Sequence, residues 1–208
     1  MKKSSLFALS LVTVALTSSQ LKANEVLTEL KVGYFHPEST KFRRIYGSAG
    51  IYGFETSVQS WCDLYTWISA DFFIKSGHSL GLRDHTNIYF LPIGLGLKWF
   101  FPLECWDFYL GGGFLATYLH IRDDSHFVVR TSPNWGWGGI AKAGVIRNFG
   151  SWFFLDLFTS YSYTHIGFHE RHHKVVYRHP ANLGGWEIGL GLGFRLGCRE
   201  VCCHTCCP

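Results

Sequence analysis

Several features that define other protein classes are missing from this 208-residue sequence. After residue 24 there is no run of about 18 apolar residues, roughly the length that a membrane-spanning helix needs. No long stretch repeats its apolar residues with a helical period, which argues against a helical domain. No polybasic tract is present either, so the sequence predicts no nucleic-acid partner.

The N-terminal segment has the three parts of a secretory leader. Lys2 and Lys3 precede an apolar run from Leu6 to Leu16, and Ala23 is a small residue at a suitable cleavage point. This pattern predicts a signal peptide over residues 1–23. A short membrane anchor is the alternative, but the apolar run is too short to span a bilayer. No cysteine follows the run, which argues against a lipoprotein.

The rest of the chain is rich in segments that alternate between apolar and polar residues. In GWEIGLGLGFRLG, the apolar side chains from Trp186 to Leu196 occupy the even-numbered positions. Glu187, Arg195 and several glycines occupy the odd-numbered positions. Successive side chains of a strand point to opposite faces, so this segment predicts a strand with one wholly apolar face. The same split occurs in IYFLPIGLGLKWF, WDFYLGGGFLATY and WFFLDLFTSYSY, with weaker copies at residues 27–35, 46–58, 63–75 and 135–147. The sequence therefore predicts eight strands.

Charged residues at the positions that alternate with the apolar ones in these strands indicate a membrane barrel. They are Glu29, Lys31, Glu55, Asp71, Lys98, Asp107, Lys142, Asp156, Glu187 and Arg195. In such a barrel the apolar parity faces lipid and the charges meet inside. Tryptophans lie near the predicted strand ends, as the aromatic girdles of membrane barrels require. Short connections at about 59–62, 101–105 and 148–151 alternate with long ones at about 36–45, 76–86, 120–134 and 165–183.

These observations predict an all-β fold, an eight-stranded antiparallel up-and-down transmembrane barrel over residues 24–197. A secreted β-sandwich or a soluble lipocalin-like barrel is the alternative. Eight strands enclose little space. We therefore expect a plugged interior in which Lys98, Lys142 and Arg195 pair with the inward carboxylates Asp71, Asp107, Asp156 and Glu187.

The alternating segments resemble the small eight-stranded outer-membrane barrels of the OmpA, OmpX and OmpW type. LPIGLGLKWFF, DFYLGGGFLATY, GGIAKAGV, WFFLDLFTSYSY and GWEIGLGLGFRLG have the rhythm of these proteins. The resemblance implies an integral protein of the bacterial outer membrane, with its outer loops exposed to the medium and with outer-membrane lipid and lipopolysaccharide around it. Such barrels commonly end on an aromatic residue, whereas this chain continues past Phe194 into GCREVCCHTCCP.

The segment GFHERHHKVVY contains the H-E-x-x-H spacing of zinc metalloproteases in His169, Glu170 and His173. That motif needs a helix to bring both histidines onto one face around a zinc ion. Here it falls in the longest predicted outer loop, Pro180 would soon end any helix, and a third ligand is missing. We therefore predict neither a metal site nor a cofactor. Histidines gather in the outer loops generally, and an ordinary polar loop explains them as well as metal capture or pH sensing.

The segment YSYTHIGFH is similar to the strand of barrel lipid A deacylases that carries a histidine and, two residues on, a nucleophilic serine. Here His165 is followed at that place by Gly167. A serine hydrolase needs its hydroxyl beside its base. The sequence therefore predicts a chain that is not an enzyme, with a lipid A-modifying barrel kept as an alternative.

The cysteines fall on one rim of the predicted barrel, because tight turns and both chain ends share a side. The disulfide candidates are Cys62 and Cys105 in turns, and Cys198, Cys202, Cys203, Cys206 and Cys207 in a periplasmic tail over residues 198–208. The periplasm is oxidising, so disulfides are expected there. An odd count leaves one thiol free or bonded to another chain. A zinc site that includes His204 is the alternative.

The sequence thus predicts a non-enzymatic outer-membrane barrel with a structural or surface-interaction role. It also predicts disulfide bonds to other Cys-rich envelope proteins. A narrow ion or solute channel is the second alternative to this function.

Overall fold

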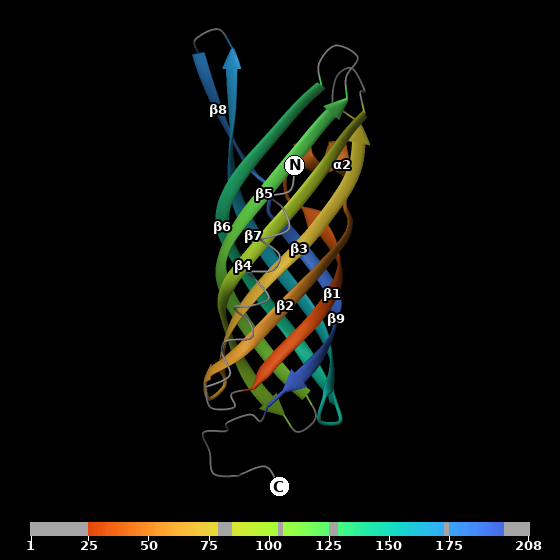
Figure 1. Ribbon diagram of the computed structural model, residues 1–208, viewed down its shortest axis with the longest axis vertical. Helices are drawn as coiled ribbons and strands as arrows, with labels where there is room; N and C mark the ends of the chain where they lie inside the picture. The colour runs from red at the N-terminus through yellow and green to blue at the C-terminus, as the bar shows by residue number, and fades with distance from the viewer. Residues whose placement is uncertain (1–24, 79–84, 104–105, 125–128, 173–174, 198–208) are drawn as a thin grey trace, which may run out of the picture.

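The structure is a computed structural model, and it describes residues 25–78, 85–103, 106–124, 129–172 and 175–197. Tilted strands wrap into a barrel, with one short helix at the upper end (Figure 1). The predicted signal peptide and the Cys-rich tail lie outside the described residues.

The strands follow one another around the barrel in chain order. The elements are β1 (Val26–Pro37), α2 (Thr40–Tyr46), β2 (Ala49–Trp61), β3 (Leu64–His78), β4 (His85–Leu103), β5 (Trp106–Asp124), β6 (Val129–Phe149), β7 (Phe153–His172), β8 (Val175–Asn182) and β9 (Gly185–Leu196). Pairing of β1 with β9 and of β6 with β7 closes the ring, and every strand pair is antiparallel. Among the described strands, β8 pairs with β7 alone. Eight strands therefore form the wall, as predicted, and β8 is an extension of β7 above it.

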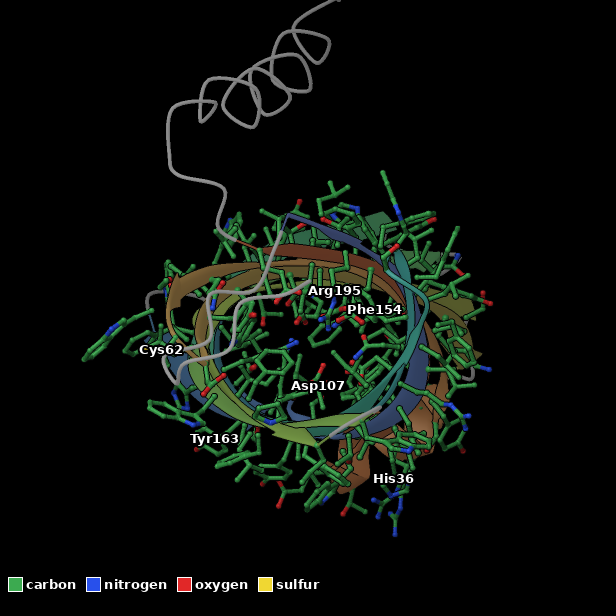
Figure 2. The ribbon with its side chains drawn as sticks, turned by 90° about the horizontal axis from the view of Figure 1, so that it is seen from below. His36, Cys62, Asp107, Phe154, Tyr163 and Arg195 are labelled. Atoms are coloured by element: carbon green, nitrogen blue, oxygen red, sulfur yellow. The ribbon has the colours of Figure 1, made fainter. Side chains whose placement is uncertain are left out.

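The two faces of the wall have the chemistry that the alternation predicts. Apolar side chains point outward, and Ile188 and Leu192 are 59% and 58% exposed. The charged side chains at the predicted inward positions do point inward, and Lys98 and Glu55 are only 2% and 1% exposed. Figure 2 shows side chains projecting into the inside of the ring. An apolar exterior around a polar interior is the arrangement of a barrel that sits in lipid.

The upper connections are shorter than the sequence predicts, because the strands run on past the lipid-facing belt. Residues 120–124 and 129–134, expected as loop, belong to β5 and β6. Residues 165–172 and 175–182 form the hairpin of β7 with β8. Pairing between β6 and β7 stops at Gly136 and Ile166, so the two hairpins continue separately beyond that point. The loop predicted over residues 36–45 is mostly replaced by the end of β1 and the helix α2.

The H-E-x-x-H segment is part of a strand. His169 and Glu170 belong to β7, where they pair with Arg178 and Tyr177 of β8. His173 lies outside the described residues. Strand backbone at His169 and Glu170 does not give the helical geometry that this zinc motif requires.

No helix among the described residues is long and apolar enough to cross a membrane.

Candidate functional site: a filled and layered lumen

The inside of the barrel is the part of the molecule where polar and titratable side chains converge. It consists of an apolar layer at the upper mouth, a charged layer in the middle and an aromatic layer toward the tight turns. Each layer draws on most of the strands, because each strand contributes every second residue to the interior.

Helix α2 forms part of the upper layer. Ser39 caps the helix by accepting a hydrogen bond from the Phe42 backbone N–H at 3.4 Å. Phe42 and Tyr46, one helical turn apart, are buried against Phe35 and Phe73 from the wall. The Tyr46 hydroxyl lies 3.0 Å from the Thr86 hydroxyl inside the barrel. The helix therefore plugs the upper mouth from a segment that the sequence predicts to be a loop.

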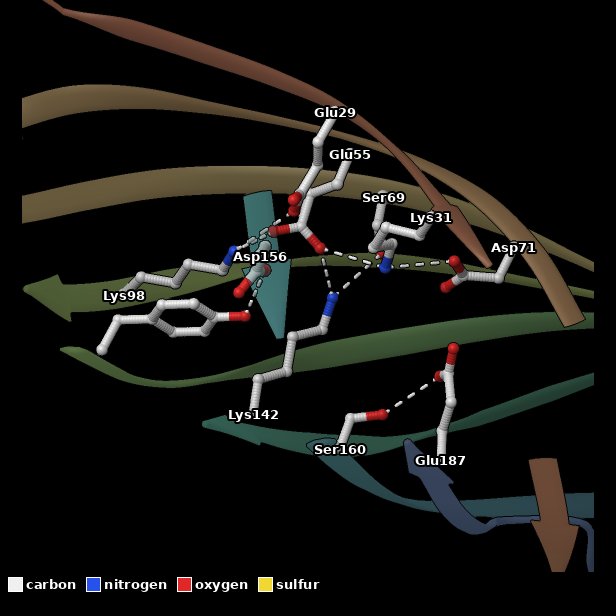
Figure 3. Close-up of polar contacts among 11 residues, drawn as sticks. Glu29, Lys31, Glu55, Ser69, Asp71, Lys98, Lys142, Asp156, Ser160 and Glu187 are labelled. Atoms are coloured by element: carbon white, nitrogen blue, oxygen red, sulfur yellow. Dashed lines mark hydrogen bonds and ion pairs between the residues drawn. The ribbon is translucent and has the colours of Figure 1, made fainter. Parts of the chain in front are cut away.

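Glu55 on β2 is the centre of the charged layer, and three lysines surround it (Figure 3). Lys31 and Lys142 reach its Oε2 at 3.2 Å and 2.6 Å, and Lys98 pairs with its Oε1. Lys31 also pairs with Asp71 at 3.1 Å. The lysines come from β1, β4 and β6, so this cluster ties opposite sides of the barrel together.

Aromatic rings cover the three ammonium groups. The Lys142 Nζ lies 3.8 Å from the centroid of the Trp67 ring, and the Lys98 Nζ lies 4.3 Å from that of Tyr109. Lys31 lies 5.2 Å from the centroid of Phe158. Ring faces attract cations, and the attraction grows when both groups are shielded from water. Each lysine is therefore held by a carboxylate and by a ring.

The predicted ion pairs are right for one cation and wrong for the two lysines. Arg195 does pair with Asp107, at 3.0 Å. Lys98 and Lys142, expected beside aspartates or Glu187, instead converge on Glu55. Two other inward carboxylates, Asp156 and Glu187, accept hydrogen bonds from hydroxyl groups. Tyr109 donates to Asp156 at 2.7 Å, and Ser160 donates to Glu187 at 3.1 Å.

The layer toward the tight turns is aromatic and ends in a polar rim. Tyr65, Phe100, Tyr109, Phe154 and Phe158 are all buried there. Beyond them, Arg195 reaches Glu25 at 2.9 Å as well as Asp107. Figure 2 shows Arg195, Asp107 and Phe154 inside the ring, seen from the turn side.

Inward glycines make room for these rings. A side chain at Gly193 would collide with the ring of Phe154, and one at Gly144 would collide with that of Tyr109. The lumen is therefore filled by side chains at several heights.

Sequence reasoning missed two parts of this site. Trp67 is fully buried inside the barrel, and its contact with Lys142 was not predicted. The helix α2 was also missed, although Ser39 before Phe42 and Tyr46 is a helix-start signal followed by apolar residues at helical spacing. A helix of 7 residues is too short for that period to stand out.

Comparison with solved structures places this architecture among known barrels. OprG of Pseudomonas aeruginosa superposes with a TM-score of 0.61 at 13% identity, covering 85% of this chain and 98% of its own. Outer membrane protein W of E. coli gives 0.57 at 14% identity, covering 85% and 100%. Ail, the attachment invasion locus protein of Yersinia pestis, in complex with the heparin analogue sucrose octasulfate, gives 0.55 at 12%, covering 84% and 100%. No protein-family model and no curated protein matches the sequence.

The chain has the fold of the small eight-stranded outer-membrane barrels. The likeness in fold covers most of the chain. The apolar exterior is an independent physical reason to place the barrel in lipid. At these identities the similarity defines the fold and leaves the role of the barrel open.

The strand with the deacylase-like segment places His165 on the outer face of the barrel wall. His165 is exposed and lies opposite Trp137 of β6, while Thr164 and Ile166 point inward and are buried. Gly167, at the place where a deacylase has serine, supplies no hydroxyl. Among the described residues no three His, Cys, Asp or Glu side chains are grouped so that they could hold a metal ion.

Of the seven disulfide candidates, the structure describes Cys62 alone. It lies in the turn between β2 and β3, with a positive φ of 43°. Cys62 is disulfide-bonded, and its partner lies outside the described residues. Cys105, Cys198, Cys202, Cys203, Cys206 and Cys207 also lie outside them, so the pairing remains a prediction.

Proposed function

We propose that this barrel is a non-enzymatic and non-conducting protein with a structural and surface-interaction role. The observation that carries the proposal is the filled lumen. An apolar plug, an ion-paired layer and an aromatic layer follow one another along the axis. A conducting pore needs a continuous polar path, and two of these layers are apolar.

Planar-bilayer recording tests the closed lumen directly. The purified barrel should give no conductance steps above those of the bare bilayer, with a porin as positive control. A variant with Phe42→Ala and Tyr46→Ala removes the upper plug and should also stay closed, because the two lower layers remain. Regular conductance steps from the wild-type barrel would instead favour a channel.

The two hairpins above the wall support a role at the surface. Long loops of outer-membrane barrels face the medium, and the hairpin of β7 and β8 leaves the outer edge of β8 unpaired among the described strands. Unpaired strand edges can accept a strand from another protein. The barrel thus presents backbone donors and acceptors to a partner outside the cell.

The Ail comparison indicates which ligand class to test first. Ail was solved with a sulfated heparin analogue, and the β7–β8 hairpin of this chain carries Arg171 and Arg178 in its sequence. The purified barrel should therefore be tested on immobilised heparin beside a variant with Arg171→Gln and Arg178→Gln. Equal retention of the two proteins, or no retention of either, would argue against a sulfated glycan at this hairpin.

We also propose that disulfide bonds link this barrel to other Cys-rich envelope proteins. The chain has seven cysteines, and pairs within one chain use an even number, so at least one is left over. Cell envelopes lysed in an alkylating agent and run without reductant should show high-mass bands that contain this protein. Those bands should collapse to the monomer on reduction, and a purely monomeric band without reductant would refute the linkage.

The lipid A-modifying alternative has its own test. Purified barrel incubated with lipid A should release no fatty acid, because Gly167 supplies no hydroxyl beside His165. Release of a fatty acid that stops in a His165→Ala variant would overturn the non-enzymatic assignment.

A further inference from the structure

Two lipid-facing side chains in the lower half of β6 are small, whereas those of the neighbouring strands β5 and β7 are bulky. Ala143 and Val145 point outward from β6 between Phe108 and Leu110 of β5 and Leu157 of β7. The difference in side-chain height creates a groove of about 500 Å³, whose lining includes the outward side chains of Phe108, Leu110, Ala143, Val145, Leu157 and Ile188. Its lining is almost entirely apolar.

The groove continues toward the rim that carries the tight turns. A second hollow of about 340 Å³ is lined by Leu103, Trp106, Phe108, Val145 and Leu157. It shares Phe108, Val145 and Leu157 with the first groove, so the two form one trough along β6. The volumes fall within the range of roughly 300–1,000 Å³ that is typical of small-molecule sites.

Arg147 lies at the turn-side end of this trough. It is opposite Trp106 in the β5–β6 register. Its guanidinium carbon is 4.9 Å from the centroid of the Trp106 ring and 5.5 Å from that of Phe149. Of the described strand side chains that face lipid, Arg147 is the only Lys, Arg, Asp or Glu. No carboxylate of the described residues pairs with it. An unpaired cation among aromatic girdle residues lies at the level of lipid headgroups.

We propose that the trough and Arg147 together form a binding site for one phospholipid. The lipid phosphate accepts hydrogen bonds from the guanidinium, whose planar fork matches phosphate oxygens. One acyl chain lies in the trough along β6, between the ridges of β5 and β7. Because tight turns of outer-membrane barrels face the periplasm, the lipid belongs to the periplasmic leaflet. This site is independent of the closed lumen and of the proposed surface role.

Charge argues against a second copy of the barrel as the occupant. Two copies that meet through β6 around a twofold axis along the membrane normal would bring both Arg147 residues to the same height. Like charges side by side in an interface are unfavourable. A phosphate, in contrast, neutralises Arg147 while its acyl chain fills the apolar trough.

Native mass spectrometry of the purified barrel with added lipid tests the site. The two probes are dioleoylphosphatidylglycerol and dioleoylglycerol, which share their acyl chains but differ in the phosphate. Wild type should retain the phosphatidylglycerol in preference. Arg147→Gln should lower its affinity roughly fivefold, as expected for one cation near a phosphate, and should leave dioleoylglycerol unchanged. Arg147→Lys should restore part of the difference because it keeps the charge.

Ala143→Leu tests the trough, and Ala70→Leu on the outward face of β3 is its matched control. Filling the trough should reduce retention of both lipids, whereas the control should behave as wild type. Heat-dependent migration on a gel verifies that each variant is a closed barrel. Equal phosphatidylglycerol retention by wild type and Arg147→Gln would overturn the proposal. A shift in the dimer fraction by Ala143→Leu, with lipid retention unchanged, would overturn it in favour of a barrel–barrel contact.

Discussion

The two faces of the barrel wall use the same backbone and reverse the usual distribution of residues. Outward positions such as Leu190 and Leu192 are apolar and exposed, whereas inward positions such as Glu55 and Lys98 are charged and buried. In a water-soluble protein the apolar face would be the buried one. The comparison teaches that burial alone does not identify the core of this molecule, because the surrounding solvent is lipid.

The two faces also differ in how they tolerate change. The outward face contacts a fluid solvent, which adapts to side-chain shape and rejects charge. The inward face is packed around fixed partners, so it accepts charge only where a counter-charge is in place and accepts volume only where a glycine leaves room. Substitutions on each face should therefore fail for different reasons.

Loss of Glu55 should produce the largest effect, because it removes the counter-charge of three buried lysines. Glu55→Ala should lower the free energy of unfolding by about 3–5 kcal/mol, the usual cost of leaving buried charges unpaired. Urea unfolding in lipid vesicles, followed by heat-dependent gel migration, measures the change. Ser160→Ala, a neutral inward change, is the control and should cost about 1 kcal/mol. A loss for Glu55→Ala no greater than that of the control would show that the cluster contributes little.

A charge on the outward face should have the next largest effect. Leu192→Arg places a guanidinium in the apolar belt and should cost about 2–4 kcal/mol if the residue is near the bilayer midplane. Leu196→Arg, at the turn-side end of the same strand, should cost only about 0–1 kcal/mol because the side chain reaches the headgroups. The same unfolding assay separates the two. Equal costs at both positions would contradict the assigned depth along β9.

Added volume on the inward face should have a moderate effect. Polarity alone predicts that a small residue at Gly193 is tolerated, but its Cβ would collide with the Phe154 ring. Gly193→Ala should therefore cost about 1–3 kcal/mol, as overpacking usually does. Gly112→Ala, on the outward face of β5, is the control for replacing a strand glycine without a collision, because its added Cβ lies 3.5 Å from its nearest neighbour, Ile140 O. If Gly193→Ala unfolds at the same urea concentration as the control, the Phe154 ring has moved aside at little cost.

A label in the upper hairpin should leave stability unchanged and report which end of the barrel faces outward. An epitope inserted after Arg171 in β7, or protease cleavage near Arg171 or Arg178, should be detectable on intact cells because long loops face the medium. Cleavage should be slow, because the paired strands β7 and β8 protect the backbone there. An epitope that antibodies reach only after permeabilisation would invert the topology.

The wall was predictable residue by residue, and the contents of the lumen were not. Alternation around Leu192 and Gly193 fixes which side chain faces lipid, because the period of a strand is two. Alternation does not say which inward residues lie at the same height on opposite strands. Lys98 was therefore expected beside an aspartate and is found beside Glu55. The helix over Thr40–Tyr46 was missed for a related reason, since its buried position depends on Phe73 across the mouth.

The sequence by itself determined the strands, the lipid-facing side of each and the closed antiparallel barrel, because local alternation carries that information. Only the tertiary structure decided that Glu55 collects three lysines, that α2 plugs the upper mouth and that β8 continues from β7 above the wall. These features depend on strand tilt and on the register between strands, which bring together residues such as Glu55 and Lys142 that are far apart in the chain. The hollow along β6 likewise arises only where small side chains of one strand lie between bulky ones of its neighbours.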